Sequence, residues 1–204
     1  MRTIEERLRR RDDAEAMAER AARAARAVTE RASREGLVDI AYGWVDTPVG
    51  RMLAAATEDG LLRLGFQEER VDLTLEDLAR KVSPRILQDE LRLEKVRRQL
   101  GEYFEGRRKV FDMPIDRQLI HGFHRQVLDV TERIPYGQVS TYGEVAGRAG
   151  NPRASRAAGN ALGSNPIPIV IPCHRVVRTG HGLGGYGGGL HVKQLLLDLE
   201  GARL

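Results

Sequence analysis

The chain has 204 residues, of which 41% are hydrophobic and 30% charged, a balance typical of a globular protein with one large or two small domains. It lacks the long apolar stretch of a transmembrane helix and the apolar core of a signal peptide, so we expect an intracellular protein with no membrane partner. Its single cysteine excludes an intramolecular disulfide and a cysteine-rich zinc site, and we predict no metal. The net charge of +4 slightly favours a polyanionic partner such as nucleic acid.

Residues 1–35 are rich in arginine, alanine and glutamate, with no glycine or proline before Gly36. Apolar side chains recur there at roughly helical spacing, which predicts a long helix with a thin apolar stripe. The stripe comprises Ile4, Leu8, Met17, Ala21, Ala25, Val28 and Ala32. This block is either a solvated extension or a helix that docks, self-associates or contacts DNA.

Residues 37–66 alternate in polarity and contain two turn sequences, which predicts an antiparallel meander. Residues 86–105 are predicted to form an amphipathic helix that ends at Gly106. Its expected inner face comprises Leu87, Leu91, Val96, Leu100, Tyr103 and Phe104. With a short extended segment at 111–115, these elements indicate a small supporting α+β domain.

A helix is predicted from Phe123, followed by two short helices. Thr141 and Glu144 have the spacing of a capping box at the start of the first. Asn151 and Pro152 are typical of an N-cap and first helical residue, and they place the start of the second. The pair forms a helix-turn-helix, or an ordinary helix pair of the kind that many helical domains contain.

The second of these helices presents mainly small residues around one long side chain, Arg156. The small positions are Ala154, Ser155, Ala157, Ala158, Gly159 and Ala161. Such a surface allows close approach to a nucleic-acid groove, with Arg156 projecting from it. Alternatively, the small residues seat the helix against a neighbour.

The only cysteine lies in the segment PIVIPCHRVV at 168–177, which we predict to be a buried strand interrupted by prolines. A free cysteine is commonly an inert core residue, but His174 beside Cys173 provides a proton acceptor for a thiol nucleophile. Neighbouring side chains on a strand point to opposite faces, so contact between the two requires a bridging water or a non-strand backbone. Glu200, in the C-terminal helix, is either the group that orients the imidazole or a surface carboxylate.

PIVIPCHRVV, the helix pair before it and the run GGYGGGL with Lys193 after it resemble the O6-alkylguanine-DNA alkyltransferases. The resemblance extends from about residue 123 to 204. A weaker one covers the TPVG turn at 47–50, GLLRL at 60–64 and QLGEYFEG at 99–106. Residues 1–35 lie outside it.

The resemblance implies an α+β fold. We expect an extra N-terminal helix at 1–35, a small α/β domain of ribonuclease-H-like type at 36–116, and a mainly helical domain with the helix-turn-helix at 117–204. It also implies a monomer that acts on double-stranded DNA containing alkylated guanine, with the N-terminal helix making a further contact. No cofactor is expected, because the damaged DNA carries the alkyl group. The expected location is the cytoplasm, with the nucleoid in a bacterium, or the nucleus in a eukaryote.

The resemblance assigns the chemistry to Cys173, which would take the alkyl group of a flipped O6-alkylguanine, and of O4-alkylthymine, as a thioether in a single turnover. His174 would act as base through a water, held by Glu200. Tyr142 would assist proton transfer to the leaving base, and Asn165 would brace the helix-turn-helix against the active-site segment.

DNA contact is assigned to the small-residue helix and to Tyr142, with Arg156 filling the gap left by the flipped nucleotide. The substrate pocket is assigned to Pro168, Val176, Tyr186 and Gly187. The family often has serine or arginine where Gly187 stands, so the range of substrates is open. The alternative functions are a module that binds alkylguanine without repair, whose known examples lack the cysteine, and a cysteine hydrolase, which would need an oxyanion hole.

Overall fold

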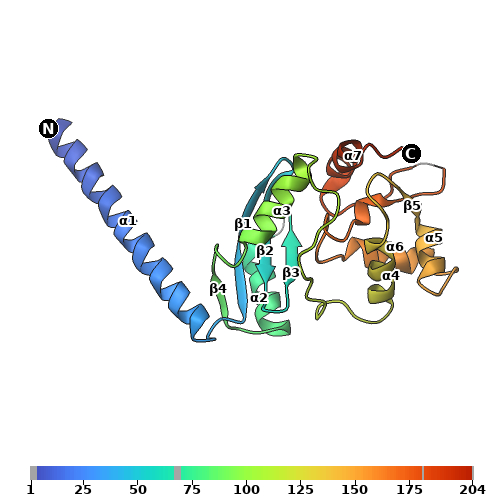
Figure 1. Ribbon diagram of the computed structural model, residues 1–204, viewed down its shortest axis with the longest axis horizontal. Helices are drawn as coiled ribbons and strands as arrows, with labels where there is room; N and C mark the ends of the chain where they lie inside the picture. The colour runs from blue at the N-terminus through green and yellow to red at the C-terminus, as the bar shows by residue number, and fades with distance from the viewer. Residues whose placement is uncertain (1–3, 67–69, 181, 204) are drawn as a thin grey trace.

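The computed structural model describes residues 4–66, 70–180 and 182–203. Helix α1 (Ile4–Arg34) extends away from the rest of the chain as a single rod (Figure 1). Met17 and Val28 of the predicted stripe are exposed, and Ile4 and Leu8 lie outside the residues whose side chains are described. Close to its end, Ser33 Oγ donates a hydrogen bond to Asp89 Oδ2 at 2.9 Å. No helix within the described ranges is long and apolar enough to span a bilayer.

The predicted meander is confirmed. Strands β1 (Ile40–Thr47), β2 (Gly50–Ala56) and β3 (Leu61–Gly65) pair antiparallel, and the short strand β4 (Ile86–Gln88) lies parallel beside β1. The sheet order is β3-β2-β1-β4.

The helix predicted at 86–105 is wrong in its first half. Residues 86–88 form β4, and helix α3 begins only at Glu94 and ends at Phe104. Leu91, expected on the inner face, is 64% exposed, whereas Val96, Leu100 and Tyr103 are buried as predicted. The free edge of β1 offers unpaired backbone groups, and pairing with them overrides the local helical pattern.

Helices cover both faces of the sheet. Helix α2 (Val71–Lys81), which the sequence analysis did not predict, packs Leu78 against Ile40 and Leu62. The other face of the sheet includes Met52 and Leu64, which join the larger core with residues of α3. An irregularity in the pairing of β2 with β3 at Ala55 and Ala56 places Leu64 on the opposite face from Leu62.

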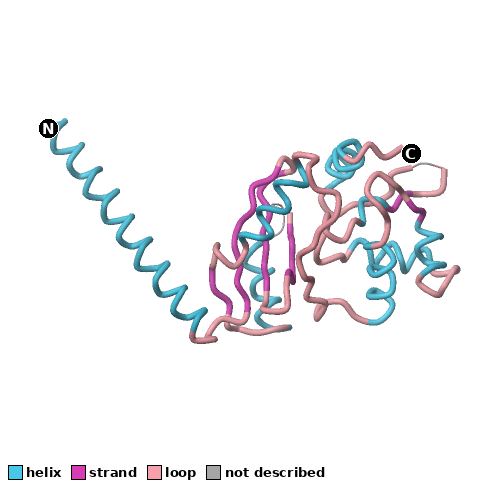
Figure 2. The backbone as a smooth tube through the Cα atoms, viewed as in Figure 1, coloured by secondary structure: helices cyan, strands magenta, loops and turns pink. Residues whose placement is uncertain are grey.

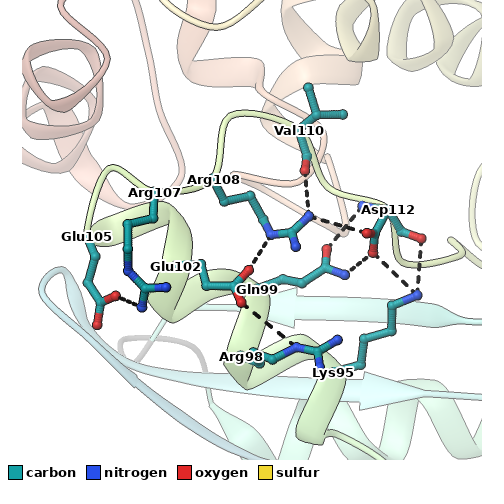
Figure 3. A network of polar contacts seen from close by, with 9 residues as sticks. All are labelled: Lys95, Arg98, Gln99, Glu102, Glu105, Arg107, Arg108, Val110 and Asp112. Carbon is teal, nitrogen blue, oxygen red and sulfur yellow. Dashed lines mark hydrogen bonds and ion pairs between the residues drawn. The ribbon is translucent and has the colours of Figure 1, made fainter.

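A polar network holds the segment that follows α3 against that helix (Figure 3). The Gln99 side-chain amide donates to Asp112 and accepts the backbone N–H of Asp112 at 3.1 Å. Arg108 Nε donates to Glu102 Oε2 at 2.7 Å. These contacts hold the last turn of α3, and with it Tyr103, in a fixed position.

The C-terminal part is mainly helical (Figure 2). It contains α4 (Gly122–Glu132), α5 (Tyr142–Arg148), α6 (Ser155–Gly163) and α7 (Gly189–Leu199). A two-stranded parallel sheet joins β5 (Ser140–Thr141) to β6 (Val176–Val177). The two parts share one hydrophobic core, and Leu64 N of β3 donates to the Pro166 carbonyl at 2.8 Å. The whole is an α+β fold, as expected.

The capping box is confirmed, because Thr141 Oγ1 accepts the Glu144 N–H at 3.2 Å and Glu144 Oε2 accepts the Thr141 N–H at 2.8 Å. The predicted start of the second helix is wrong: α6 begins at Ser155, and Asn151 is not its N-cap. Asn151 Oδ1 instead accepts the Arg153 N–H at 3.2 Å, so its side chain closes a local turn before the helix.

Candidate active site

The backbone at Cys173 is a tight turn. Residues Cys173–Arg175 form a short 3₁₀ turn, so the predicted strand is wrong at this point. Ile169, with φ of 73°, is the one non-glycine residue with positive φ in the described part of the chain. Pro168 and Pro172 have no N–H to donate to a sheet ladder, which favours this bent path over a strand.

Asn165 holds the thiol in place. Its Nδ2 donates to the Ile171 carbonyl at 2.9 Å and lies 3.2 Å from Cys173 Sγ, while its Oδ1 accepts the Ile167 N–H at 3.0 Å. Asn165 thus ties the end of α6 to the cysteine segment. Burial raises the pKa of Cys173 to about 11, although Asn165 and the charge of Lys193 oppose that effect. The resting thiol therefore keeps its proton.

His174 is completely buried, and its Nε2 lies 2.9 Å from Glu200 Oε1. Burial lowers the pKa of the imidazole, against the opposing effect of Glu200, so the ring is neutral at pH 7. A neutral ring that donates from Nε2 presents Nδ1 as an acceptor. That atom is also buried, and it has no hydrogen-bond partner in the described part of the chain.

Glu200 is buried and accepts several hydrogen bonds, so the interpretation as a surface carboxylate is wrong. Tyr103 Oη donates at 2.7 Å, the Gly137 N–H at 3.1 Å, and Arg175 at 2.8 Å from both Nε and Nη2. Burial alone would raise the pKa of Glu200, but the hydrogen bonds from His174 and Arg175 outweigh it and lower the pKa to about 2. The group is a firmly ionised carboxylate.

Two side-chain partners of that carboxylate, Arg175 and Tyr103, and the contacts of a buried lysine were not predicted from the sequence. Arg175 also donates to the Ile134 carbonyl at 2.5 Å. Lys193 Nζ donates to the carbonyls of Val176 and Leu183 at 2.5 Å each, and burial lowers its pKa to about 8. An arginine inside an apolar run signals a buried charge that needs a partner, so Arg175 could have been found from sequence. Tyr103 carries no such signal.

The residues predicted to contact DNA lie on α5 and α6 and in the turn between them. Arg156 and Ala157 are exposed, Ala154 and Ser155 are half-buried, and the ring of Tyr142 lies against Gly159. Ala158 and Ala161, in contrast, are completely buried. Ala158 and Ala161 therefore seat α6 against its neighbours, and the opposite face leaves Arg156 and Ala157 exposed; contact of that face with DNA stays a prediction.

Two cavities meet at Cys173. The first, of about 510 Å³, is lined by Tyr142, Arg156 and Gly159, and we call it the helix-side cavity. The second, of about 650 Å³, lies between the N-terminal sheet domain and the helical domain and is lined by residues of both, including Phe66 and Pro168; we call it the interdomain bay. The residues common to both are Leu162, Gly163, Cys173, Tyr186 and Gly187.

The glycine-rich loop lies between two aromatic rings. A Cβ on Gly184, whose φ is 72°, would lie 2.6 Å from Tyr142 Oη, and one on Gly188 would lie 2.8 Å from the Phe66 ring. Phe66 also meets Tyr186 edge-on, with the ring centroids 5.7 Å apart. Two of the loop's glycines are thus required by close approach, and the loop forms the shared wall of the cavities.

Family models match both parts of the chain. The ribonuclease-like domain of 6-O-methylguanine DNA methyltransferase matches residues 40–117, and the DNA-binding domain of the same family matches residues 122–202. The chain belongs to the 6-O-methylguanine DNA methyltransferase family. Helix α1 lies outside both matches.

Individual relatives agree with this assignment. A methylated-DNA–protein-cysteine methyltransferase of Methanosarcina acetivorans is 37% identical over 79% of this chain and 98% of its own. The constitutive methyltransferase of Bacillus subtilis is 37% identical over 78% of this chain and 94% of its own. The crystal structure of Mycobacterium tuberculosis OGT in complex with DNA is 34% identical, with a TM-score of 0.68 over 79% of this chain and 92% of that one.

Proposed function

We propose that this methyltransferase-family protein repairs DNA by moving the alkyl group of O6-alkylguanine, and of O4-alkylthymine, onto its own Cys173. The main support for this proposal is a buried array of side chains. Asn165 holds the thiol, and Glu200 holds His174, whose Nδ1 has no hydrogen-bond partner in the described part of the chain. Cys173, at one end of this array, lies where two cavities meet, beside the helix pair of a DNA-binding domain.

The proposed reaction is a displacement at the alkyl carbon. A bond forms between Cys173 Sγ and that carbon while the bond from carbon to guanine O6 breaks. The thiol proton moves through a water to His174 Nδ1, and the ionised Glu200 stabilises the resulting imidazolium. Tyr142, at the start of α5, supplies a proton to the departing guanine and regains one from water, while the imidazolium releases its proton to water. The thioether has no hydrolysable bond, so each molecule reacts once and needs no cofactor.

Access to a base in a duplex requires the nucleotide to be flipped out, at a cost of a few kcal/mol. The exposed Arg156 on α6 would fill the vacated space in the stack, and the small exposed residues beside it would let the helix approach the minor groove. Contacts with phosphates would add affinity that does not depend on sequence, as a protein that searches for damage requires.

Mass spectrometry of the intact protein tests this proposal. The protein is incubated with a duplex that contains one O6-methylguanine, and we expect a gain of one methyl group, located on Cys173 and absent in Cys173→Ser. Repeated turnover would indicate a hydrolase-like enzyme. Duplex binding without transfer would indicate a module that only recognises the lesion, and either result would refute the proposal.

The role of Arg156 has a separate test. We predict that Arg156→Ala slows transfer from duplex DNA about tenfold, because a flipped base is no longer replaced in the stack. Transfer from free O6-alkylguanine base should change much less. Arg133→Ala, which removes an exposed arginine at the end of α4, is the matched control. Equal losses on duplex and free base would contradict the flipping role.

We further propose that the protein is a monomer located in the cell compartment that contains the DNA. Its two domains comprise residues 36–116 and 117–204, and residues 1–35 make a separate contact. The continuous core between the two parts supports a single rigid body, and the exposed face of α1 supports a further contact. Light scattering with and without DNA measures the association state.

A further inference from the structure

One hydrogen bond reaches the buried array from outside the helical part of the chain. Tyr103 Oη, in the last turn of α3, donates to Glu200 Oε1 at 2.7 Å. The other donors to Glu200 in the described part of the chain belong to Gly137, His174 and Arg175, all beyond α4. Tyr103 is completely buried, and burial together with the charge of Glu200 raises its pKa, so the hydroxyl keeps its proton and remains a donor.

The bond is made at the same oxygen atom that holds the imidazole. Glu200 Oε1 also accepts from His174 Nε2 at 2.9 Å and from Arg175 Nη2 at 2.8 Å. Three donors around one oxygen fix its place, and each of them weakens its attraction for a further proton. Resting on the proposed function, we propose that Tyr103 is a positioning residue for alkyl transfer, through which the ribonuclease-like domain at 40–117 holds Glu200 Oε1 against His174 Nε2.

The surroundings of Tyr103 hold its hydroxyl in place. Its ring meets Phe104 and Tyr136 edge-on, with centroids 5.3 and 6.2 Å away, and lies tilted against Phe111 at 5.4 Å. Gln99, one turn earlier on α3, belongs to the polar network that holds this end of the helix (Figure 3). Because the ring is already held on several sides, its hydroxyl binds the carboxylate with little further loss of conformational entropy.

Removing the hydroxyl should change the proton affinity of His174. The ring is neutral because burial lowers its pKa, and Glu200 is the group that opposes this effect. A carboxylate that has lost one donor attracts the second proton of the imidazole more strongly, so the pKa of His174 should rise. The other titratable groups near the ring are unchanged in such a variant; they are Arg175, Lys193, Tyr186 and Cys173.

The test compares Tyr103→Phe with Tyr136→Phe in the full chain. Tyr103→Phe keeps the buried ring and removes the donor to Glu200. Tyr136→Phe is the matched control, because it removes a hydroxyl from the neighbouring ring that donates to the Leu199 carbonyl at 3.0 Å and not to the carboxylate. Circular dichroism establishes that both variants fold.

The first measurement is an NMR titration of His174 in the resting protein, with isotope-labelled histidine and the signal assigned by its loss in His174→Gln. We expect the midpoint to rise by at least about half a pH unit in Tyr103→Phe and to stay unchanged in Tyr136→Phe. A purely structural role for Tyr103 would lower the melting temperature without moving this midpoint.

The second measurement is the single-turnover rate on O6-methylguanine duplex as a function of pH. Tyr103→Phe should lower the plateau about tenfold, because Glu200 no longer fixes the imidazole. The pH at which the rate is half the plateau should rise together with the NMR midpoint. Tyr136→Phe should match the unaltered protein in both respects.

A second variant covers the case in which Tyr103→Phe does not fold. Replacing Tyr103 by 3-fluorotyrosine keeps the ring and the hydroxyl but makes the hydroxyl a stronger donor, so the midpoint of His174 should fall instead of rise. A shift in the opposite direction would contradict the role of this hydrogen bond.

The outcomes separate the two proposals. A midpoint that Tyr103→Phe leaves unmoved, or that Tyr136→Phe moves equally, would overturn the positioning role whatever the rate of methyl transfer. Absence of methyl transfer by the unaltered protein would overturn the proposed function, and the titration, which needs neither DNA nor transfer, would still decide whether Tyr103 acts on His174.

Discussion

Glu200 links the chemistry of the site to the stability of the fold. A buried charge is tolerated only when it is paired and hydrogen-bonded, and this carboxylate has partners from three parts of the chain: Tyr103, Gly137 and the adjacent pair His174 and Arg175. The same oxygen atoms that hold the imidazole also neutralise a buried guanidinium.

We predict that Glu200→Gln lowers the free energy of unfolding by about 3 kcal/mol at pH 7, because Arg175 is left as an uncompensated buried charge. The lowered pKa of Glu200 means that its stabilising effect is complete above the ordinary value of 4.5 and is lost as the pH falls toward about 2. The difference between the two proteins should therefore shrink over that range. Urea unfolding at a series of pH values measures it, and a constant difference would contradict the assignment.

The lowered pKa of His174 predicts the pH profile of transfer. Since burial keeps the imidazole neutral below its ordinary pKa of 6.5, the single-turnover rate should stay level as the pH falls through that value. An exposed histidine base would lose half its activity there. The rate is measured with DNA fully bound at each pH, and a midpoint at or above 6.5 would exclude a buried neutral base.

At the residue scale, the sequence was sufficient to place Cys173, His174 and Asn165, which lie close together in the chain, in one candidate site, and their catalytic roles stay predictions. It was insufficient for Tyr103, which is 97 positions from the carboxylate that it contacts. A tyrosine on the apolar face of a helix is usually a core residue. The residues next to Tyr103 in the sequence do not indicate that it has a polar partner in another domain.

At the element scale, the glycine-rich loop forms a fixed wall of the two cavities, although its composition is typical of a flexible segment. Gly184 has a left-handed backbone and touches Tyr142, and Gly188 touches Phe66, so both positions exclude a side chain. The loop lies between Tyr142 at the start of α5 and Phe66 directly after β3.

We predict that Gly184→Ala slows transfer at least about tenfold, since the added methyl group displaces Tyr142 or the loop and small misplacements at a reacting centre are costly. Gly182→Ala is the matched control, because its Cβ would make only ordinary contacts, at 3.6 Å and beyond, with Arg178. Single-turnover rates on O6-methylguanine duplex provide the comparison. Equal rates for the two variants would show that the close approach is not needed.

Elements with strong local signals were predicted correctly, including the meander and the capping box of α5. The failures share a physical cause. β4 forms because β1 has a free edge, α6 starts late because Asn151 closes a turn, and the cysteine segment bends because two prolines cannot join a ladder. In each case a contact or constraint outside the periodic pattern prevailed.

At the scale of the whole molecule, α1 is an appendage to a compact body. We predict that deleting residues 1–35 leaves the rate of methyl transfer unchanged, because the described contacts of α1 with the body are confined to its last turns, near Ser33. The truncated and full proteins are compared by intact mass over time. A slower rate in the truncated protein would assign α1 a part in the reaction.

The position of Glu200 in the chain orders events during synthesis. A growing chain exposes Cys173 before Glu200, 26 residues beyond His174, has been made, and before that carboxylate can meet Tyr103 of the first domain. Until then the imidazole has no fixed tautomer and the thiol has the exposure and pKa of an ordinary cysteine. The pair of His174 and Glu200 therefore forms among the last contacts, together with the C-terminal domain to which it belongs, and only then does His174 present Nδ1 as a fixed acceptor for the thiol proton.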